Sequence, residues 1–237
     1  MAEAGLFQEW LAAGKPILAD GAMGTLLHAH GVSIEACFDE LNRTQPDLVA
    51  GIHAAYLQAG AQVLESNSFG ANRFKLAAHG LENQVGEINA AAVALARQAI
   101  RAAGKEALVA GSVGPLGVRL APFGRVKPAQ AREAFQEQIA ALAEAGADLI
   151  IIETQSDLYE LQEAVLAARE VCELPVVASV TFTRDDRTLL GIRPDGPPGC
   201  CWSRGRRSSG PTVPAGRHSC CAWRSSCGWW PPRSACP

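Results

Sequence analysis

Five short apolar runs rich in β-branched residues recur between residues 16 and 182, and longer segments with helical periodicity separate them. The runs are 16–20 (PILAD), 61–67 (AQVLESN), 107–113 (ALVAGSV), 148–154 (DLIIIET) and 175–182 (PVVASVTF). Apolar residues recur at intervals of three and four in the intervening segments, near 44–59, 82–103, 127–146 and 157–171. Because strand and helix alternate, a parallel sheet with crossover helices is favoured, and we expect five consecutive βα units.

Residues at the predicted helix boundaries agree with this interpretation. Thr44 or Pro46 suits the start of the first of these helices, and Gly60 and Gly146 suit the ends of two of them. Five units in about 165 residues fall three short of a (β/α)₈ barrel. A doubly wound open sheet would already be adequate in size, so the periodicity leaves both architectures open.

The composition indicates a folded chain that acts on a small molecule. The 237 residues are 48% apolar and 19% charged, which is enough to bury a sizeable core. A formal charge of −3 gives no overall attraction to nucleic acid or to an anionic membrane. No apolar run approaches the ~18–20 residues of a spanning helix, and the N-terminus lacks the basic and apolar regions of a secretory signal. We therefore expect a cytoplasmic protein with neither nucleic acid nor membrane as a partner.

Small and polar residues follow four of the apolar runs, at 20–24, 65–70, 111–115 and 153–157. The carboxyl ends of parallel strands meet at one face, which is where barrels and open α/β sheets bind ligands. We therefore expect Asp20, Asn67 and Glu153 to lie around one mouth. Each also has a structural explanation: Asp20 can cap a turn, Asn67 can satisfy a loop backbone, and Glu153 can lie beside a helix N-cap.

The composition changes abruptly near Gly191. Residues 192–237 contain no Leu, Phe, Tyr, Met, Lys, Glu, Gln or Asn, yet they hold six of the eight Cys, four of the five Trp and eight of the 14 Pro. Natural domains do not have such a composition. Because few aliphatic side chains are available to offset the entropy of ordering, we expect 192–237 to be a disordered tail after a partial barrel domain at 1–191.

Several stretches of the chain, in this order and spacing, resemble the homocysteine S-methyltransferase family. They are ILADGAMGTLL, ESNSFGANRFKL, AGSVGPLG and DLIIIETQSDLYEL, which begin at residues 17, 65, 110 and 148. HGLENQVGEINAAAVALAR, GPLGVRLAPFGRV and ASVTFTRDDRTLLG are closer still to bacterial bifunctional members that join a homocysteine methyltransferase to a methylenetetrahydrofolate reductase. The resemblance covers residues 5–191 nearly continuously.

This resemblance implies a (β/α)₈ barrel whose mouth binds homocysteine and one Zn²⁺. The family's substrate-binding aspartate and glycine match Asp20 and Gly21, and the glutamate that holds the substrate ammonium matches Glu153. We place Asn67 with them as a substrate-binding residue. In the family, zinc converts the substrate thiol to a thiolate nucleophile, which attacks the methyl group of a donor. The donor is methyltetrahydrofolate acting through cobalamin, or another methyl compound.

The family's three zinc cysteines lie in a Gly-x-Asn-Cys context and in a Gly-Gly-Cys-Cys context, and neither context occurs in this chain. Two adjacent pairs do occur, Cys200-Cys201 and Cys220-Cys221, among Arg, Pro, Trp and Ser and with no strand pattern before them. We therefore predict no metal ligand and no catalytic residue in this chain, and no bound zinc.

A shift of the reading frame near Gly191–Ile192 explains the tail. Codons for residues 210–214 (GPTVP), read one base out of register, can encode Ala-Asn-Cys-Ser, which holds the missing cysteine context. The barrel would then lack its last three βα units, with open sheet edges at the first and fifth apolar runs.

Two hypotheses from different classes follow. In the first, the chain is a homocysteine S-methyltransferase that makes methionine. In the second, it is a catalytically inactive fragment that binds an amino acid through Asp20, Gly21 and Glu153 and lacks the zinc cysteines.

Overall fold

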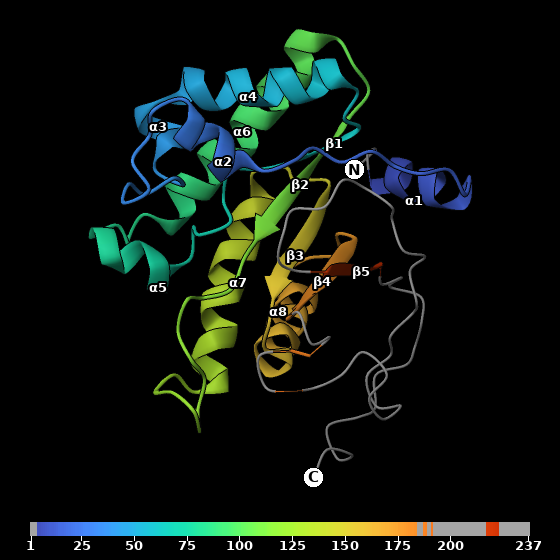
Figure 1. Cartoon of the computed structure of the whole chain (residues 1–237). Helices are drawn as coiled ribbons and strands as arrows, with labels where there is room; N and C mark the ends of the chain where they lie inside the picture. The colour runs from blue at the N-terminus through green and yellow to red at the C-terminus, as the bar shows by residue number, and fades with distance from the viewer. Residues whose placement is uncertain (1–3, 184–186, 189–190, 192–216, 223–237) are drawn as a thin grey trace.

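The computed structural model describes residues 4–183, 187–188, 191 and 217–222, and it shows a parallel sheet with helices packed against it (Figure 1). Four strands lie side by side in chain order, each parallel to the next: β1 (Val63–Glu65), β2 (Leu108–Val113), β3 (Leu149–Gln155) and β4 (Val176–Phe182). The crossover helices are α4 (Pro46–Ala59), α6 (Val85–Ala103), α7 (Pro128–Glu144) and α8 (Leu158–Val171). Sequential strand order without a reversal is that of a barrel and not of a doubly wound sheet. The fold is a partial (β/α)₈ barrel.

The first predicted strand is shorter than expected. Residues 16–20 form only an isolated parallel bridge, from Ala19 to Val63, with the Asp20 N–H donating to the Val63 carbonyl at 2.9 Å. Leu18 is 54% exposed, because in the described part of the chain nothing pairs with the outer side of this segment. The expectation of five strands in 16–182 is therefore corrected to four strands and a bridge.

The open edge expected after the fifth apolar run is paired in the structure. Strand β5 (Arg217–Ala222) runs antiparallel to β4, from Phe182 opposite Arg217 to Val177 opposite Ala222. An edge strand presents unpaired N–H and C=O groups, and this short segment satisfies those of β4. Residues 217–222 belong to the segment expected to be a disordered tail, and they form this strand, whereas the rest of 192–237 lies outside the described residues.

Buried side chains alternate between the two faces of the sheet. Val109 and Ile150 point to one face and pack with the crossover helices in the largest core cluster, which includes Phe135 of α7. Their neighbours Leu108 and Leu149 belong to a separate cluster on the other face. Strands buried on both faces are typical of parallel sheets, and this explains why their sequences are continuous apolar runs.

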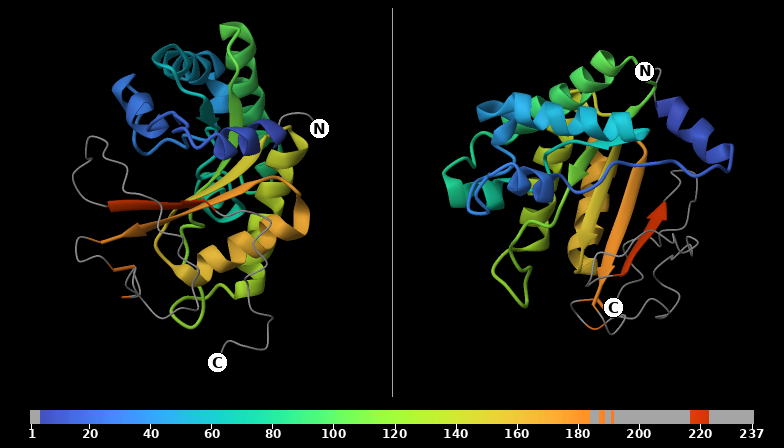
Figure 2. Two further views of the ribbon diagram at one scale, coloured as in Figure 1. Left: turned by 90° about the vertical axis from the view of Figure 1, so that its right-hand side faces the viewer. Right: turned by 45° about the horizontal axis from the view of Figure 1, so that its top comes forward.

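Helix α1 (Ala4–Ala12) closes the amino-terminal end of the sheet (Figures 1 and 2). Its Phe7 is 7% exposed and packs with Val63, Leu108 and Leu149. Shorter helices occur within the connections: α2 (Met23–Ala29), α3 (Leu41–Thr44), α5 (Arg73–Leu76) and the 3₁₀ helix η1 (Ala77–His79). Within the described residues, no helix is both long enough and apolar enough to cross a membrane.

The predicted helix boundaries are confirmed at three of the named positions. Pro46 is the first residue of α4, which has Gln45 as its N-cap. Gly60 caps the end of α4 with φ of 103°, and Gly146 follows α7 with φ of 92°. Glycine adopts this left-handed conformation without steric cost, so it ends a helix readily.

Candidate functional site

Three carboxyl groups meet at the carboxyl end of the sheet. Asp20 follows the first bridge, Glu65 is the last residue of β1, and Glu153 lies near the end of β3. The Glu65 backbone N–H donates to Oδ2 of Asp20 at 3.0 Å, and the charges of Glu153 and Asp20 both act on the Glu65 carboxyl group. We call Asp20, Glu65 and Glu153 the carboxyl cluster.

Two hydroxyl groups hold Glu153. Ser112 Oγ, from the neighbouring strand β2, donates to Glu153 Oε1 at 2.6 Å, and Thr154 Oγ1 donates to Oε2 at 3.3 Å. Ser112 is itself fixed, because its backbone N–H donates to Ser66 Oγ at 3.1 Å. Both oxygens of the Glu153 carboxylate therefore have donors from the protein.

The backbone is strained immediately after Glu153. Thr154 has φ of 58°, a left-handed conformation that β-branched residues rarely adopt, and the pairing register of β3 shifts between Ile152 and Gln155. Such strain persists only where surrounding structure enforces it, and it concentrates at functional sites. Here it changes the path of the strand next to the carboxyl cluster.

The protonation of the cluster differs from that of exposed carboxylates. Burial raises the pKa of Asp20 to about 7, with a contribution from the charge of Glu153, although the bond from the Glu65 N–H opposes the shift. Burial, and then the charges of Glu153 and Asp20, raise the pKa of Glu65 well above its usual value. Asp20 Oδ1 is buried and has no hydrogen-bond partner in the described part of the chain. A cationic ligand would both satisfy this oxygen and relieve the repulsion.

Gly21 directly follows Asp20 of the carboxyl cluster and lies close to the Tyr56 side chain. A Cβ atom at this position would lie 2.9 Å from the hydroxyl oxygen of Tyr56. That hydroxyl donates to the carbonyl of Ala22 at 3.2 Å, which holds the Asp20–Ala22 turn against α4. The exposed backbone of Gly21 is therefore accessible to a ligand where a larger residue would collide with Tyr56.

The Asn67 side chain is directed to a neighbouring loop. Its Nδ2 donates to the Phe38 carbonyl at 2.7 Å and to Asn42 Oδ1 at 3.2 Å, and its own carbonyl accepts from Asn42 Nδ2 at 2.7 Å. Asn67 is 6% exposed. The amide nitrogen is thus committed to the 38–42 loop, as in the structural explanation considered from the sequence.

Sequence reasoning missed two charged residues at this end of the sheet. The first is Glu65, whose signal was a carboxylate directly ending a buried apolar run. The second is Lys75 of α5, whose ammonium lies 4.4 Å from the centroid of the Phe69 ring. Burial lowers the pKa of Lys75, and the charges of Asp39, Glu160 and Glu153 oppose that shift. No local pattern in the sequence indicates this arrangement.

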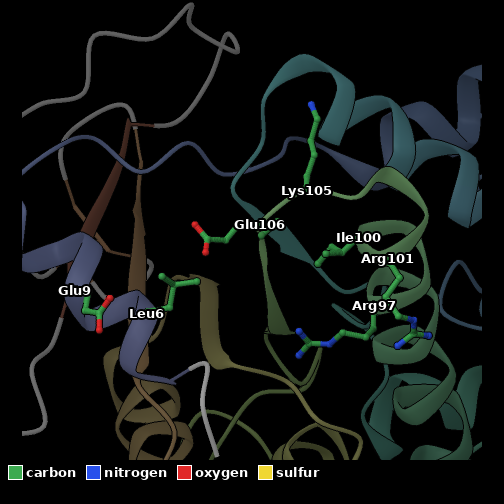
Figure 3. A pocket seen from close by; sticks show the side chains of 8 residues that line it. Leu6, Glu9, Arg97, Ile100, Arg101, Lys105 and Glu106 are labelled. Carbon is green, nitrogen blue, oxygen red and sulfur yellow. The ribbon is translucent and has the colours of Figure 1, made fainter.

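A separate cavity of about 360 Å³ lies at the opposite end of the sheet, between α1 and α6 (Figure 3). Cationic side chains line part of it, and two of them are engaged elsewhere. Arg97 pairs with Asp148 at 2.9 Å, and Lys105 donates to the Leu57 carbonyl. Since ligands of parallel α/β folds bind at the carboxyl ends of strands, this cavity is not the candidate site.

The described residues do not form a metal site of the kind the family resemblance implies. Within them there is no group of three or more His, Cys, Asp or Glu side chains arranged to hold a metal ion. Cys37 and Cys172 are free thiols, and burial raises the pKa of both. Cys220 and Cys221 lie on β5, whereas Cys200 and Cys201 lie outside the described residues.

Comparison with known proteins gives consistent matches. The family model for homocysteine S-methyltransferase matches residues 17–195. Methionine synthase from Mycobacterium tuberculosis is 34% identical over 189 residues, which are 74% of this chain and 16% of that protein. Methionine synthase from Mycobacterium leprae is 31% identical over 193 residues, 76% of this chain and 16% of that protein. The chain therefore spans about a sixth of the length of these relatives.

Solved structures of the homocysteine methyltransferase MmuM from Escherichia coli share the fold. The metallated form has a TM-score of 0.61 and 30% identity, with 70% of this chain and 63% of that chain covered. The oxidised form has a TM-score of 0.65 and 27% identity, with 75% and 66% covered. The parallel barrel strands, the carboxyl cluster at their ends and these matches lead to one conclusion. The chain belongs to the homocysteine S-methyltransferase family.

Proposed function

We propose that the mouth around the carboxyl cluster binds homocysteine. One observation carries the proposal: among the described residues, Asp20 Oδ1 is buried without a partner beside two further carboxyl groups, at the end of the sheet where barrels bind ligands. The ammonium group of an α-amino acid supplies donors and a positive charge for that oxygen. Homocysteine as the particular amino acid follows from the family and from the names of the matched proteins.

The proposed residues divide the recognition between them. Asp20 and Glu153 accept hydrogen bonds from the substrate ammonium, with Ser112 and Thr154 fixing the direction of Glu153. Gly21 contacts the amino acid through its backbone. Asn67 contributes by holding the 38–42 loop against the mouth. Charge-assisted hydrogen bonds of this kind each contribute roughly 1.5–3 kcal/mol.

Methyl transfer needs a thiolate, and a free thiol with a pKa near ~8.5 is mostly protonated at neutral pH. In the homocysteine S-methyltransferase family, as the sequence resemblance implies, zinc converts the thiol to the thiolate. The described residues of this chain do not fit a three-cysteine zinc site. We therefore propose that the 237-residue chain binds homocysteine and does not by itself catalyse its methylation. For the intact family fold we further propose a cytoplasmic location and a methyl donor, such as methyltetrahydrofolate acting through cobalamin.

The direct test is calorimetric titration of the purified chain with L-homocysteine under reducing conditions. Asp20→Asn and Glu153→Gln should each weaken binding about tenfold to a hundredfold, because each removes one charge-assisted bond to the ammonium. Glu82→Gln is the matched control, since Glu82 is exposed and outside the cluster. Unchanged affinity in both site variants would refute the assignment.

Activity and metal content separate the two hypotheses on catalysis. Metal analysis should find no stoichiometric zinc in the purified chain, and incubation with homocysteine and a methyl donor should yield no methionine. Stoichiometric zinc together with methionine formation would establish the transferase and overturn the proposal of an inactive fragment.

A further inference from the structure

One hydroxyl group near the carboxyl end of β4 is buried without a partner. Thr181 Oγ1 is inaccessible to solvent, and it has no hydrogen-bond partner in the described part of the chain. A buried hydroxyl group that makes no hydrogen bond destabilises the fold. Like Asp20 Oδ1, this atom is therefore a candidate to bind a ligand.

The alternation of side chains along the strands places Thr181 on the same face of the sheet as the carboxyl cluster. Val177 of β4 and Ile151 of β3 both pack with the core cluster on the face away from the crossover helices. Residues two positions apart on a strand share a face. Thr181 lies four positions after Val177, and Glu153 lies two positions after Ile151, so both side chains are on this inner face.

Strand pairing places Thr181 beside the strand that carries Glu153. Strands β3 and β4 are parallel neighbours, and Gln155 lies opposite Val180. Glu153 is two positions before the first residue of this pair, and Thr181 directly follows the second. Because neighbouring strands are only ~4.8 Å apart, the two side chains belong to the rim of the same mouth.

The two unpartnered groups suit the two ends of a zwitterion. Asp20 Oδ1 is an acceptor, whereas the hydroxyl group of Thr181 can donate a hydrogen bond. An α-amino acid has an ammonium group and a carboxylate on the same carbon atom. The proposed function assigns the ammonium group to Asp20 and Glu153, and it assigns no side chain to the carboxylate.

We infer that the Thr181 hydroxyl group donates a hydrogen bond to the α-carboxylate of the bound amino acid. The inference rests on the proposed amino-acid site and adds a fourth strand to it. It also gives the site a basis for selectivity, because an amine that lacks the carboxylate leaves Thr181 without a partner.

Thr181→Val and Thr181→Ser test the donor role by calorimetric titration with L-homocysteine. Valine has nearly the shape of threonine and no hydroxyl group, so Thr181→Val should weaken binding about tenfold. Thr181→Ser keeps the hydroxyl group and should bind within about threefold of the wild-type chain. Thr44→Val is the matched control, since Thr44 is exposed at the end of α3. In thermal melts Thr181→Val should unfold at or above the wild-type temperature, because it removes a buried hydroxyl group that has no partner in the described part of the chain.

A ligand without the carboxylate identifies the group that Thr181 binds. 3-Aminopropane-1-thiol is homocysteine without its carboxylate, and its affinity should be the same for the wild-type chain and for Thr181→Val. Unchanged homocysteine affinity in Thr181→Val, an equal loss for both ligands, or a clearly lower melting temperature would overturn the inference and leave the proposed function standing. Failure of the wild-type chain to bind L-homocysteine would refute the proposed function and this inference together.

Discussion

The backbone N–H of Glu65 lies 3.0 Å from Oδ2 of Asp20, so the last residue of β1 holds the acid that follows residues 16–20. These residues form only one bridge to β1, and this bond therefore contributes to the direction in which Asp20 points. The bond leaves Oδ1 buried and without a partner in the described part of the chain. The arrangement favours a cationic ligand over the empty site.

Replacement of Asp20 by asparagine should weaken homocysteine binding and increase the stability of the ligand-free chain. The pKa of Asp20 is raised from 3.8 to about 7, so the folded state binds a proton more tightly than the unfolded state, and the resulting stabilisation is lost as the pH rises through 7. Asp20→Asn should therefore be more stable than the wild-type chain by about 1–2 kcal/mol at pH 8 and by less at pH 5. Urea unfolding at the two pH values measures the difference. An equal difference at both would contradict the raised pKa.

His53 should make the fold sensitive to acid. It is fully buried on α4, neither ring nitrogen has a partner in the described part of the chain, and burial lowers its pKa from 6.5 to about 4. The unfolded state then takes up a proton that the folded state does not, so stability falls as the pH drops from 6.5 towards 4. Between pH 7 and pH 5 this loss amounts to about 2 kcal/mol. His53→Leu should remove that part of the slope in urea unfolding curves, and a slope identical to wild type would show that His53 is not its source.

Thr154 should be replaceable at a gain in stability. Asparagine tolerates the left-handed conformation better than a β-branched residue, so Thr154→Asn should raise the free energy of unfolding by about 1 kcal/mol. The variant loses the hydroxyl that donates to Glu153, and homocysteine affinity should fall severalfold. Thr154→Ser, which keeps the hydroxyl, is the control for binding. Loss of stability in Thr154→Asn would argue against strain at this position.

Replacement of Asp148 should lower the stability of the fold and leave ligand binding at the carboxyl end of the sheet unchanged. It is 5% exposed, accepts the Val109 N–H at 2.7 Å and pairs with Arg97 at 2.9 Å. Asp148→Asn retains an acceptor but leaves the Arg97 charge without this partner, which should cost about 2–3 kcal/mol. Calorimetric titration below the melting temperature should give an unchanged homocysteine affinity. A large loss of affinity in a folded variant would mean that the two ends of the sheet are coupled.

The sequence predicted the central strands, which are buried on both faces, and did not predict how the edges of the sheet are paired or where the short helices lie. The runs around Val109 and Ile150 are apolar because both faces of β2 and β3 are covered, and their helices have enough turns to show a period. Residues 16–20 have the same composition but pair on one side only. Helices α2, α3 and α5 are seven, four and four residues long, which is too short to establish a period.

The site was predictable to the extent that it depends on strand ends. Asp20 and Glu153 follow apolar runs, and parallel pairing brings such positions together. The place of Glu65 in the cluster depends on the hydrogen bond from its backbone N–H to Asp20, 45 positions earlier in the chain, and that of Lys75 on its placement over Phe69. Strand β5 forms because β4 has unpaired backbone groups. The sequence of β5 itself (RHSCCA) has no pattern that predicts a strand.

Strand β3 connects the amino-terminal end of the sheet, where Asp148 stabilises the fold, to the carboxyl end, where the candidate ligand site lies. Asp148, which pairs with Arg97 of α6, directly precedes the strand, and Glu153 lies near its end, with the apolar residues 149–152 between them. Mutations around Glu153 can therefore alter which ligand is recognised while the anchor at Asp148 continues to hold the strand in place. Because the two ends of the strand have separate roles, substitutions near Glu153 can change ligand specificity without loss of the fold. Random libraries confined to the residues around Glu153 should therefore yield mostly folded proteins.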